Sequence, residues 1–487
     1  MPMKKGQEVI GIVDKVDFPN RGVVRVTEGE DVCYVKIKNV ICQQKLRIRI
    51  TKKRHGEYEG KVLEVLEKSP WEREEHSCMH FPACGGCLYQ TIRYQDQLRM
   101  KEEQIRDLLL PVIGERYDAV YDGISPSPIP KEYRNKMELT FGDNEKDGEL
   151  MLGMHKRGSF YDIVPTVECL LMDKDMRKIQ KRTLLFFREK GTSYYHKRTH
   201  QGYLRHLLLR KAKKTGEILV DLITSTDVPN TCVESTLLLE WKERVLDESY
   251  DGRIVGILHT KNDRQADVVC DQGTEILFGT DSFEEKLLGL TFAITPFSFF
   301  QTNALGAEVL YEKVRKMILD VTKAGYGHRI PRIYDLYSGT GTITQIMSAV
   351  AMEAVGVELV PEAVRAAEKN AKMNDISNCR FICGDVLTVL DDLSEKPDFI
   401  ILDPPRDGIH PKALPKIIAY GVKHILYISC KATSLARDLP VFFEAGYEAE
   451  RLALVDMFPS TGGIEVVCLL SLASYDVRVK RYFAPPG

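Results

Sequence analysis

The sequence predicts a mixed α/β protein with a small N-terminal β-barrel, a central α+β domain and a C-terminal doubly wound sheet. The chain has 487 residues, which is enough for two to four domains. Residues 1–67 contain short β-like runs separated by glycine-rich and charged turns, a pattern typical of a barrel of the OB kind. Residues 291–487 alternate strand-like and helix-like segments, which is typical of a largely parallel sheet covered by helices. Residues 68–290 mix both types in no diagnostic order.

The composition is that of a globular protein without membrane segments. Hydrophobic residues make up 44% and charged residues 28% of the chain. No apolar run approaches the roughly 18 residues that span a bilayer. The start, M-P-M-K-K-G-Q-E, lacks the apolar core of a signal peptide. We therefore expect a cytoplasmic protein with no membrane association, and we expect a monomer.

The predicted barrel carries a basic stretch, Q-Q-K-L-R-I-R-I-T-K-K-R, at residues 43–54. Apolar residues alternate there with cations, so a strand would bury one face and present a basic one. Because the net charge of the whole chain is only −2, any nucleic-acid site must be local. The stretch itself contains no acid, so Lys45, Arg47 and Arg49 are candidates for RNA phosphate contacts. The alternative is an edge strand protected by charge.

Three cysteines of the central region lie close together in C-M-H-F-P-A-C-G-G-C: Cys78, Cys84 and Cys87. Twelve cysteines in an intracellular chain favour metal ligands or a nucleophile over disulfides. Four thiolates suit zinc or a [4Fe-4S] cluster, and spacing does not separate the two. A helix over residues 94–109 and strands over 202–210 and 216–224 complete the expectations for this region.

A cofactor pocket is predicted at the first strand–helix junction of the C-terminal domain, in D-L-Y-S-G-T-G-T. Gly339 and Gly341 would let the backbone turn tightly and approach a ligand. Glu358 ends the next strand, where an acid can bind ribose hydroxyls. Asp385 and Asp403 end later strands. Because the full G-x-G-x-x-G of dinucleotide folds is absent, S-adenosylmethionine fits better than a dinucleotide.

A cysteine and a glutamate complete the predicted reaction centre. Cys430 ends the strand-like run H-I-L-Y-I-S, and Glu465 precedes the run E-V-V-C-L-L. A thiolate that adds to C6 of uracil makes C5 nucleophilic, and a carboxylate can then remove the C5 proton. Lys431 and the start of the following helix could lower the thiol pKa. The alternatives are a buried cysteine and a surface glutamate.

The ordered motifs resemble those of the RNA uracil-C5 methyltransferase family, which includes 23S rRNA 5-methyluridine enzymes and tRNA-acting relatives. They are S-F-F-Q-T-N, D-L-Y-S-G-T-G-T, V-G-V-E, L-D-P-P-R-D-G, Y-I-S-C, S-L-A-R-D-L and D-M-F-P-S-T-G-G-I-E. The resemblance implies a class I, Rossmann-like methyltransferase domain and an N-terminal TRAM barrel. It makes Cys430 the nucleophile and Glu465 the base. It implies that S-adenosylmethionine is bound by Gln301, Tyr337, Glu358, Asp385 and Asp403.

The resemblance also extends to two further assignments. Phe299 aligns with an aromatic residue near the target base, and Cys169 aligns with a fourth cluster ligand, which favours a [4Fe-4S] cluster. The sequence departs from many relatives after the nucleophile, where it reads Cys430-Lys431-Ala432 rather than C-N-P, and this bears on substrate choice. Thr342 and Gly463 are smaller departures.

The expected substrate is RNA, with 23S rRNA favoured and tRNA as the alternative. A cytosine-C5 methyltransferase would show a Pro-Cys motif, which Pro404-Pro405 lacks. A non-catalytic RNA-binding iron–sulfur protein would not need both Cys430 and Glu465.

Overall fold

The structure is a computed structural model, and it divides into two compact units. The described residues are 3–73, 78–145, 148–228, 233–325, 328–392 and 395–473. The first unit comprises Met1–Ser77, Cys87–Pro126 and Pro404–Gly487, and the second comprises Cys78–Gly86 and Ser127–Asp403. The units therefore cut across the linear boundaries expected near residues 67 and 290. No helix among the described residues is long and apolar enough to cross a membrane.

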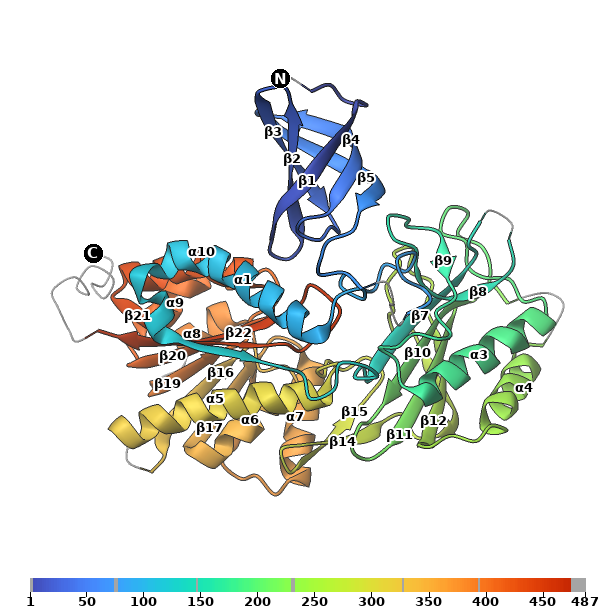
Figure 1. Cartoon of the computed structure of the whole chain (residues 1–487). Helices are drawn as coiled ribbons and strands as arrows, with labels where there is room; N and C mark the ends of the chain where they lie inside the picture. The colour runs from blue at the N-terminus through green and yellow to red at the C-terminus, as the bar shows by residue number, and fades with distance from the viewer. Residues whose placement is uncertain are drawn as a thin grey trace. The chain divides into compact units, whose positions relative to one another are not determined.

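The N-terminal part of the first unit is the expected five-stranded barrel (Figure 1). Its strands are β1 (Glu8–Asp17), β2 (Arg21–Glu28), β3 (Asp31–Lys38), β4 (Lys45–Arg54) and β5 (Glu57–Glu67). They follow the order β1-β2-β3-β5-β4, and pairing of β1 with β4 closes the barrel. Leu46, Ile48 and Ile50 of β4 point into its core, which confirms the alternation read from the sequence.

A short helical segment and one strand follow in the first unit. Helix α1 (Tyr94–Ile113) confirms the helix expected at residues 94–109. The turn η1 (Gly114–Arg116) and helix α2 (Tyr117–Val120) lead into β6 (Tyr121–Ser125). Strand β6 pairs in parallel with β21 (Tyr447–Val455), more than 300 residues later in the chain. An N-terminal segment thus completes the C-terminal sheet.

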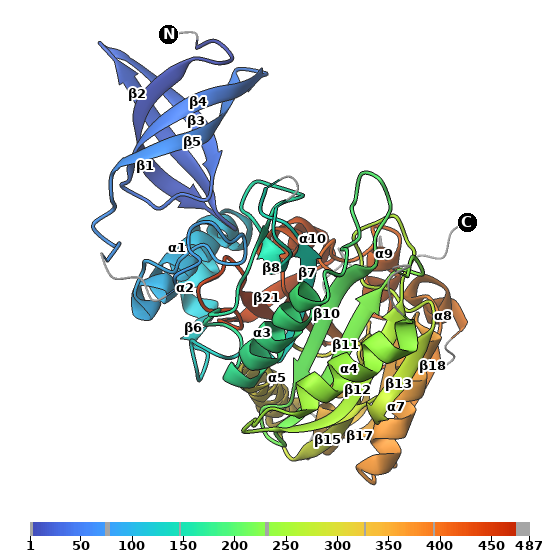
Figure 2. The same ribbon diagram turned by 90° about the vertical axis from the view of Figure 1, so that its right-hand side faces the viewer.

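The second unit contains a seven-stranded sheet in the order β13-β12-β11-β10-β7-β8-β9. Its strands are β7 (Lys136–Gly142), β8 (Met151–His155), β9 (Ile163–Val164), β10 (Leu204–Lys211), β11 (Glu217–Thr224), β12 (Arg253–Lys261) and β13 (Thr274–Gly279). Helices α3 (Lys174–Glu189) and α4 (Glu234–Leu246) pack on one face, and their Phe187 and Trp241 are fully buried (Figure 2). Strands β10 and β11 confirm the two strands predicted for this region.

The C-terminal sheet has eight strands in the order β18-β17-β16-β19-β20-β22-β21-β6. The remaining strands are β16 (Ile330–Leu336), β17 (Ala351–Glu358), β18 (Cys379–Cys383), β19 (Phe399–Leu402), β20 (His424–Ser429) and β22 (Glu465–Leu472), and a separate hairpin joins β14 (Phe283–Leu287) and β15 (Leu290–Ile294). The helices are α5 (Ala304–Gly325), α6 (Thr342–Met347), α7 (Pro361–Met373), α8 (Val386–Asp392), α9 (Ala413–Ala419) and α10 (Ala432–Glu444), with the turn η2 (Ser348–Val350).

The strand order is that of a doubly wound α/β sheet. Strands β16 to β19 pair in parallel, whereas β22 is antiparallel to both β20 and β21. The order reverses at β16, because the chain continues first to β17 and β18 and then returns to β19. Ligands of such sheets bind beyond the carboxyl ends of the strands at this reversal. The loop after β16 therefore lies where such a sheet binds its ligand.

Candidate active site

The loop after β16 has the backbone of a ligand-binding turn. Tyr337, Gly339 and Gly341 have φ angles of 70°, 54° and 72°, in the left-handed region that favours glycine. A Cβ on Gly341 would lie 2.6 Å from the Phe381 ring, so a larger residue would collide with β18. A Cβ on Gly339 would meet no atom within 4 Å. The loop thus presents open backbone at Gly339, as the sequence predicts.

Glu358, at the end of β17, is fixed beside this loop. One of its oxygens accepts a 2.9 Å hydrogen bond from the Gly339 N–H, and the other accepts one of 2.9 Å from the Val360 N–H. Both bonds leave lone pairs on a half-buried carboxylate. The buried Ser338 Oγ has no hydrogen-bond partner within the described part of the chain. A polar ligand over Gly339 would find unused hydrogen-bonding capacity on both residues.

Two acids at the carboxyl ends of neighbouring strands hold their protons unusually tightly. Burial raises the pKa of Asp403, after β19, to about 7, and the charge of Asp335 adds to this effect. Burial likewise raises the pKa of Asp335 to about 7, although the Thr344 hydroxyl donates a 2.6 Å hydrogen bond to it. The sequence pointed to Asp403 but not to Asp335, because no local pattern reveals that β16 and β19 are neighbours.

The other predicted cofactor residues differ in their surroundings. Asp385 is exposed, and its Oδ1 accepts a 2.9 Å hydrogen bond from the Leu387 N–H at the start of α8. Gln301 is half-buried. Phe299 is 68% exposed, and its carbonyl accepts a 3.3 Å hydrogen bond from the Thr340 hydroxyl of the glycine loop. The segment containing Phe299 therefore lies beside the predicted cofactor loop.

Cys430 and Glu465 lie at adjacent ends of two paired strands. The antiparallel register of β20 and β22 ends with Ser429 opposite Val466, so the residues directly beyond this pair are Cys430 and Glu465. Glu465 is 3% exposed, whereas Cys430 is half-buried and accessible. Residues directly opposite each other on antiparallel strands have Cα atoms about 5 Å apart. The sheet thus places Cys430 and Glu465 at adjacent strand ends, although 35 residues separate them in the sequence.

The loop before Glu465 is held by a buried lysine that sequence reasoning missed. Lys101 of α1 is fully buried and donates to Asp456 Oδ1 at 2.7 Å, to the Phe458 carbonyl at 3.1 Å and to the Gly463 carbonyl at 2.9 Å. Burial lowers the pKa of Lys101, and the neighbouring carboxylate opposes that shift. A single lysine in a helix gives no sequence signal for such a role.

The A-R-D part of the S-L-A-R-D-L motif fixes the loop on the other side of Cys430. Asp438 Oδ2 accepts hydrogen bonds from the Tyr427 hydroxyl at 2.9 Å and from the Ile409 N–H at 3.1 Å. Arg437 donates to the Asp407 carbonyl at 2.8 Å. This motif therefore positions the loop at residues 404–409 against β20 and α10.

Three of the four predicted cluster cysteines, Cys78, Cys84 and Cys169, lie close enough together for the charge of one to raise the pKa of another. Burial raises the pKa of Cys84, and Cys169 and Cys78 raise it further; burial also raises the pKa of Cys169, again with a contribution from Cys78. Cys87 is buried, and its sulfur accepts a 3.3 Å hydrogen bond from the Gln90 amide. Across the described ranges, however, no three His, Cys, Asp or Glu side chains are arranged as a metal site.

The three candidate RNA-binding cations of the basic strand are each paired with a carboxylate, and this corrects one premise of the sequence interpretation. The ion pairs across neighbouring strands are Lys45 with Glu67 at 2.6 Å, Arg47 with Glu64 at 2.6 Å, and Arg49 with Glu8 at 2.7 Å. Their carboxylates belong to β5 and β1, which lie outside residues 43–54. RNA contact by these cations stays a prediction.

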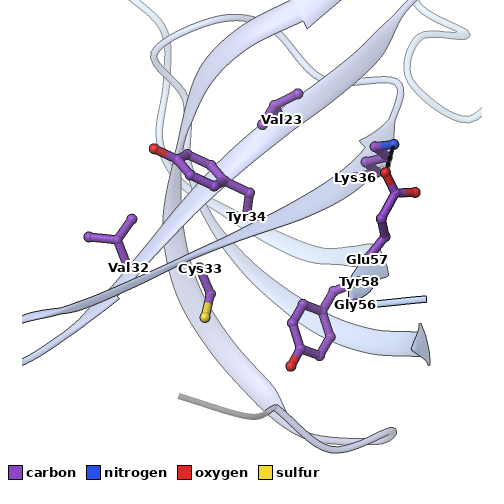
Figure 3. Close-up of a pocket in the computed structure, with 8 residues that line it drawn as sticks. All are labelled: Val23, Val32, Cys33, Tyr34, Lys36, Gly56, Glu57 and Tyr58. Atoms are coloured by element: carbon purple, nitrogen blue, oxygen red, sulfur yellow. Dashed lines mark hydrogen bonds and ion pairs between the residues drawn. The ribbon is translucent and has the colours of Figure 1, made fainter. Parts of the chain in front are cut away.

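The barrel also carries a pocket of roughly 310 Å³ on its surface (Figure 3). Its lining includes Val32, Tyr34 and an ion pair in which Lys36 Nζ lies 2.6 Å from a Glu57 oxygen. This pocket belongs to the barrel and includes none of the predicted cofactor residues.

Comparison with known proteins identifies the family. A family model described as a methyltransferase domain matches residues 331–433. An uncharacterized RNA methyltransferase of Clostridium tetani is 44% identical over 468 residues, covering 96% of this chain and 98% of that protein. One from Caldanaerobacter subterraneus subsp. tengcongensis is 40% identical over 470 residues, covering 96% and 99%.

A solved structure shows the same fold over nearly the whole chain. The Pyrococcus abyssi tRNA (uracil-54, C5)-methyltransferase, in complex with S-adenosyl-L-homocysteine, aligns with a TM-score of 0.70 at 23% identity. The alignment covers 95% of this chain and 100% of that one. With relatives that are 40% and 44% identical along almost their entire length, the chain belongs to the RNA methyltransferase family.

Proposed function

We propose that this protein is an S-adenosylmethionine-dependent RNA uracil-C5 methyltransferase. The observation that carries the proposal is the register of β20 and β22, which leaves Cys430 and Glu465 as neighbours beyond the Ser429–Val466 pair. An accessible thiol beside a buried carboxylate suits addition to an electron-poor ring followed by removal of a proton. The uracil-specific activity of the Pyrococcus abyssi protein supports the same reading by analogy of fold.

The loops after β16, β17, β18 and β19 would hold S-adenosylmethionine. The open backbone at Gly339 and the spare lone pairs of Glu358 fit a ligand with ribose hydroxyls, as does the Ser338 hydroxyl, which has no partner among the described residues. The residues proposed to line this site are Gln301, Tyr337, Gly339, Gly341, Glu358, Asp385 and Asp403. When bound, S-adenosylmethionine supplies an electrophilic methyl group that becomes attached to C5 of the base.

Cys430 acts as the nucleophile in this proposal. Its thiolate forms a bond to C6, and the C5–C6 double-bond electrons move toward C5 and the C4 carbonyl. The residue precedes α10, a 13-residue helix whose first turn has no side-chain cap. The N–H groups at the start of an α-helix and the positive end of its dipole can stabilise a nearby thiolate.

Glu465 acts as the base that completes the reaction. After C5 carries the methyl group, its remaining proton moves to the Glu465 carboxylate. The C5–C6 double bond re-forms, and the bond between sulfur and C6 breaks to release the Cys430 thiolate. Because Lys101 holds the Gly463 carbonyl, the loop that leads into Glu465 is fixed from within the same unit.

We propose 23S rRNA as the substrate, with tRNA as the alternative favoured by the fold neighbour's own specificity. Mapping 5-methyluridine in rRNA and tRNA from cells without the gene separates the two. We also propose that the barrel is a TRAM domain that contacts RNA. Finally, Cys78, Cys84, Cys87 and Cys169 are proposed to hold a [4Fe-4S] cluster. The proximity of Cys78, Cys84 and Cys169 supports this assignment.

A trapped intermediate tests the chemistry. Glu465→Gln keeps the shape of the side chain but cannot accept the C5 proton, so the methylated adduct should persist. Incubation with radiolabelled S-adenosylmethionine and substrate RNA should give a denaturation-resistant protein–RNA band that carries the label. The matched control is Glu444→Gln, which changes an exposed acid at the end of α10 and should turn over normally.

Adding Cys430→Ala to Glu465→Gln should remove the band. Normal turnover by Glu465→Gln would refute Glu465 as the base and point to Asp403. A band that survives Cys430→Ala would refute the nucleophile.

A further inference from the structure

The second unit carries an exposed surface of paired aromatic and basic side chains that the methyl-transfer chemistry does not use. It is formed by the loop between β8 and β9 and by the segment before β10, and we call it the aromatic–basic surface. Its members are His155, Phe160, Tyr161, Lys197 and Arg198. Phe160 and Tyr161 are adjacent in sequence, and their side chains are 60% and 45% exposed. Exposed apolar groups gathered in this way mark an interaction site.

Each aromatic ring is accompanied by a cation. Lys197 Nζ lies 4.6 Å from the centre of the Phe160 ring, and the Arg198 guanidinium lies 4.3 Å from the centre of the Tyr161 ring. The His155 ring stacks nearly parallel to Phe160, with an interplanar angle of 7° and centroids 6.0 Å apart. The Phe160 and Tyr161 rings meet edge to face at 5.5 Å. The two rings therefore present differently oriented faces, both beside positive charge.

A half-buried acid, Asp267, holds this arrangement in place. Asp267 Oδ2 accepts a 2.6 Å hydrogen bond from Lys197 and lies 3.1 Å from His155 Nε2. Lys197 also donates to the Phe160 carbonyl at 3.2 Å. These partners hold the pKa of Asp267 well below its usual range, despite burial that opposes the shift. Arg198, by contrast, has no acidic partner among the residues that the structure describes, so its charge is available to a ligand.

We propose that the aromatic–basic surface binds unpaired nucleotides of the substrate RNA, with bases stacked on Phe160 and Tyr161 and a phosphate at Arg198. Flat exposed rings beside cations suit single-stranded RNA, because every base has a face that stacks and every linkage carries a negative charge. A duplex would bring its phosphates to the cations but would keep its bases stacked within the helix. This proposal rests on the proposed function in that the RNA is the substrate of methyl transfer.

The cysteine-bearing loop supports the base of this surface. The Gly85 N–H donates to the His155 carbonyl at 3.0 Å, and the Arg157 N–H donates to the Ala83 carbonyl at 2.7 Å. The Arg157 guanidinium lies 5.4 Å from the centre of the Phe81 ring. Any group that rigidifies the cysteine loop therefore also rigidifies the loop that carries Phe160. The cysteine-bearing loop is thus tied to the aromatic–basic surface by backbone hydrogen bonds.

Binding of a fluorescent single-stranded RNA that contains the target uridine tests the proposal. Phe160→Ala and Tyr161→Ala should each weaken binding about ten-fold through lost stacking, while Phe160→Trp should retain affinity. Arg198→Gln should lower the slope of log affinity against log salt by about one, as expected for one lost phosphate contact. The matched controls are Phe278→Ala, an aromatic residue 39% exposed in the same sheet, and Lys181→Gln on α3.

Photo-crosslinking separates direct contact from loss of folding. RNA with 5-iodouridine flanking the target should crosslink to the tryptic peptide of residues 158–174 in the full-length protein. Affinity for S-adenosylmethionine should be unchanged in all variants, which reports an intact methyltransferase sheet.

If wild-type protein methylates uridine but the variants bind RNA as wild type does, and no crosslink forms on that peptide, the proposal is overturned while the function stands. If wild-type protein forms no 5-methyluridine but still binds RNA through Phe160, the function fails and the RNA surface stands.

Discussion

Replacing Lys101 with methionine tests how the catalytic loop is held. Methionine fills the space of the lysine stem but removes the charge that reaches Asp456 and the Phe458 and Gly463 carbonyls. Removing one partner of a buried ion pair typically costs about 3–5 kcal/mol, because the other charge stays buried without compensation. We therefore expect Lys101→Met to lower the free energy of unfolding of the first unit by about that amount in urea titrations.

The same change should slow catalysis. Gly463 lies two residues before Glu465, so a loosened loop misplaces the carboxylate. We expect kcat to fall about ten- to hundred-fold, which is the size of effect that a misplacement of about 1 Å produces. The affinity for S-adenosylmethionine should be unchanged, because the proposed cofactor residues belong to the second unit. Calorimetry and single-turnover methylation measure these two quantities separately.

Two further variants make the reasoning refutable. Arg99→Met changes an exposed cation of the same helix, whose nearest carboxylate is Asp96 at 3.5 Å, and should cost less than about 1 kcal/mol. Adding Asp456→Asn to Lys101→Met removes the uncompensated charge and should recover part of the loss. If Lys101→Met costs no more than Arg99→Met, the lysine does not hold the loop as we argue.

Other predictions concern the cofactor, the nucleophile, the cysteines and the barrel. The pKa of Asp403 is raised to about 7, so it is neutral below that pH and ionised above it; affinity for the cationic S-adenosylmethionine should rise as pH increases through about 7, and Asp403→Asn should flatten this profile in calorimetric titrations. Cys430→Ala should abolish methyl transfer and leave cofactor affinity nearly unchanged; a large loss of affinity would instead make the cysteine structural. Anaerobically purified protein should be brown with about four irons per chain, and Cys84→Ser should lose them; stoichiometric zinc in colourless protein would contradict the cluster. Replacing the three ion-paired cations of β4 with glutamine should reduce RNA affinity less than Arg198→Gln does, as measured by the same binding assay, because their charges are already neutralised.

The sequence predicted those parts of the fold that depend on local pattern. The alternation in β4 and the strand–helix alternation after residue 291 identify the barrel and the wound sheet, because the side-chain period reveals which face is buried. The joining of β6 to β21 was not predictable in this way. That pairing joins two segments more than 300 residues apart, and the sequence of neither segment indicates that it pairs with the other.

In the candidate site, too, local pattern identified some residues but not the neighbours that act on them. Glu358 ends a strand and Asp403 follows one, so their position at the carboxyl edge could be inferred from the chain alone. The neighbouring group that raises the pKa of Asp403 could not be inferred in this way. Asp335 affects Asp403 only because β16 and β19 are neighbours, and the acids that neutralise the basic strand come from β1 and β5. Cross-strand register decides both, and register is a property of the assembled sheet.

The pairing of β6 with β21 also determines where this chain can be cut. Without residues 87–126, β21 would become the outer strand of the sheet, with a row of free backbone N–H and C=O groups along a largely apolar strand. Such strands recruit other chains and aggregate. We expect a fragment that begins at residue 291 to elute as large species in size-exclusion chromatography. A fragment in which residues 87–126 are fused back to it should elute as a discrete species. An excised catalytic domain must therefore include a segment from far outside its apparent linear boundary.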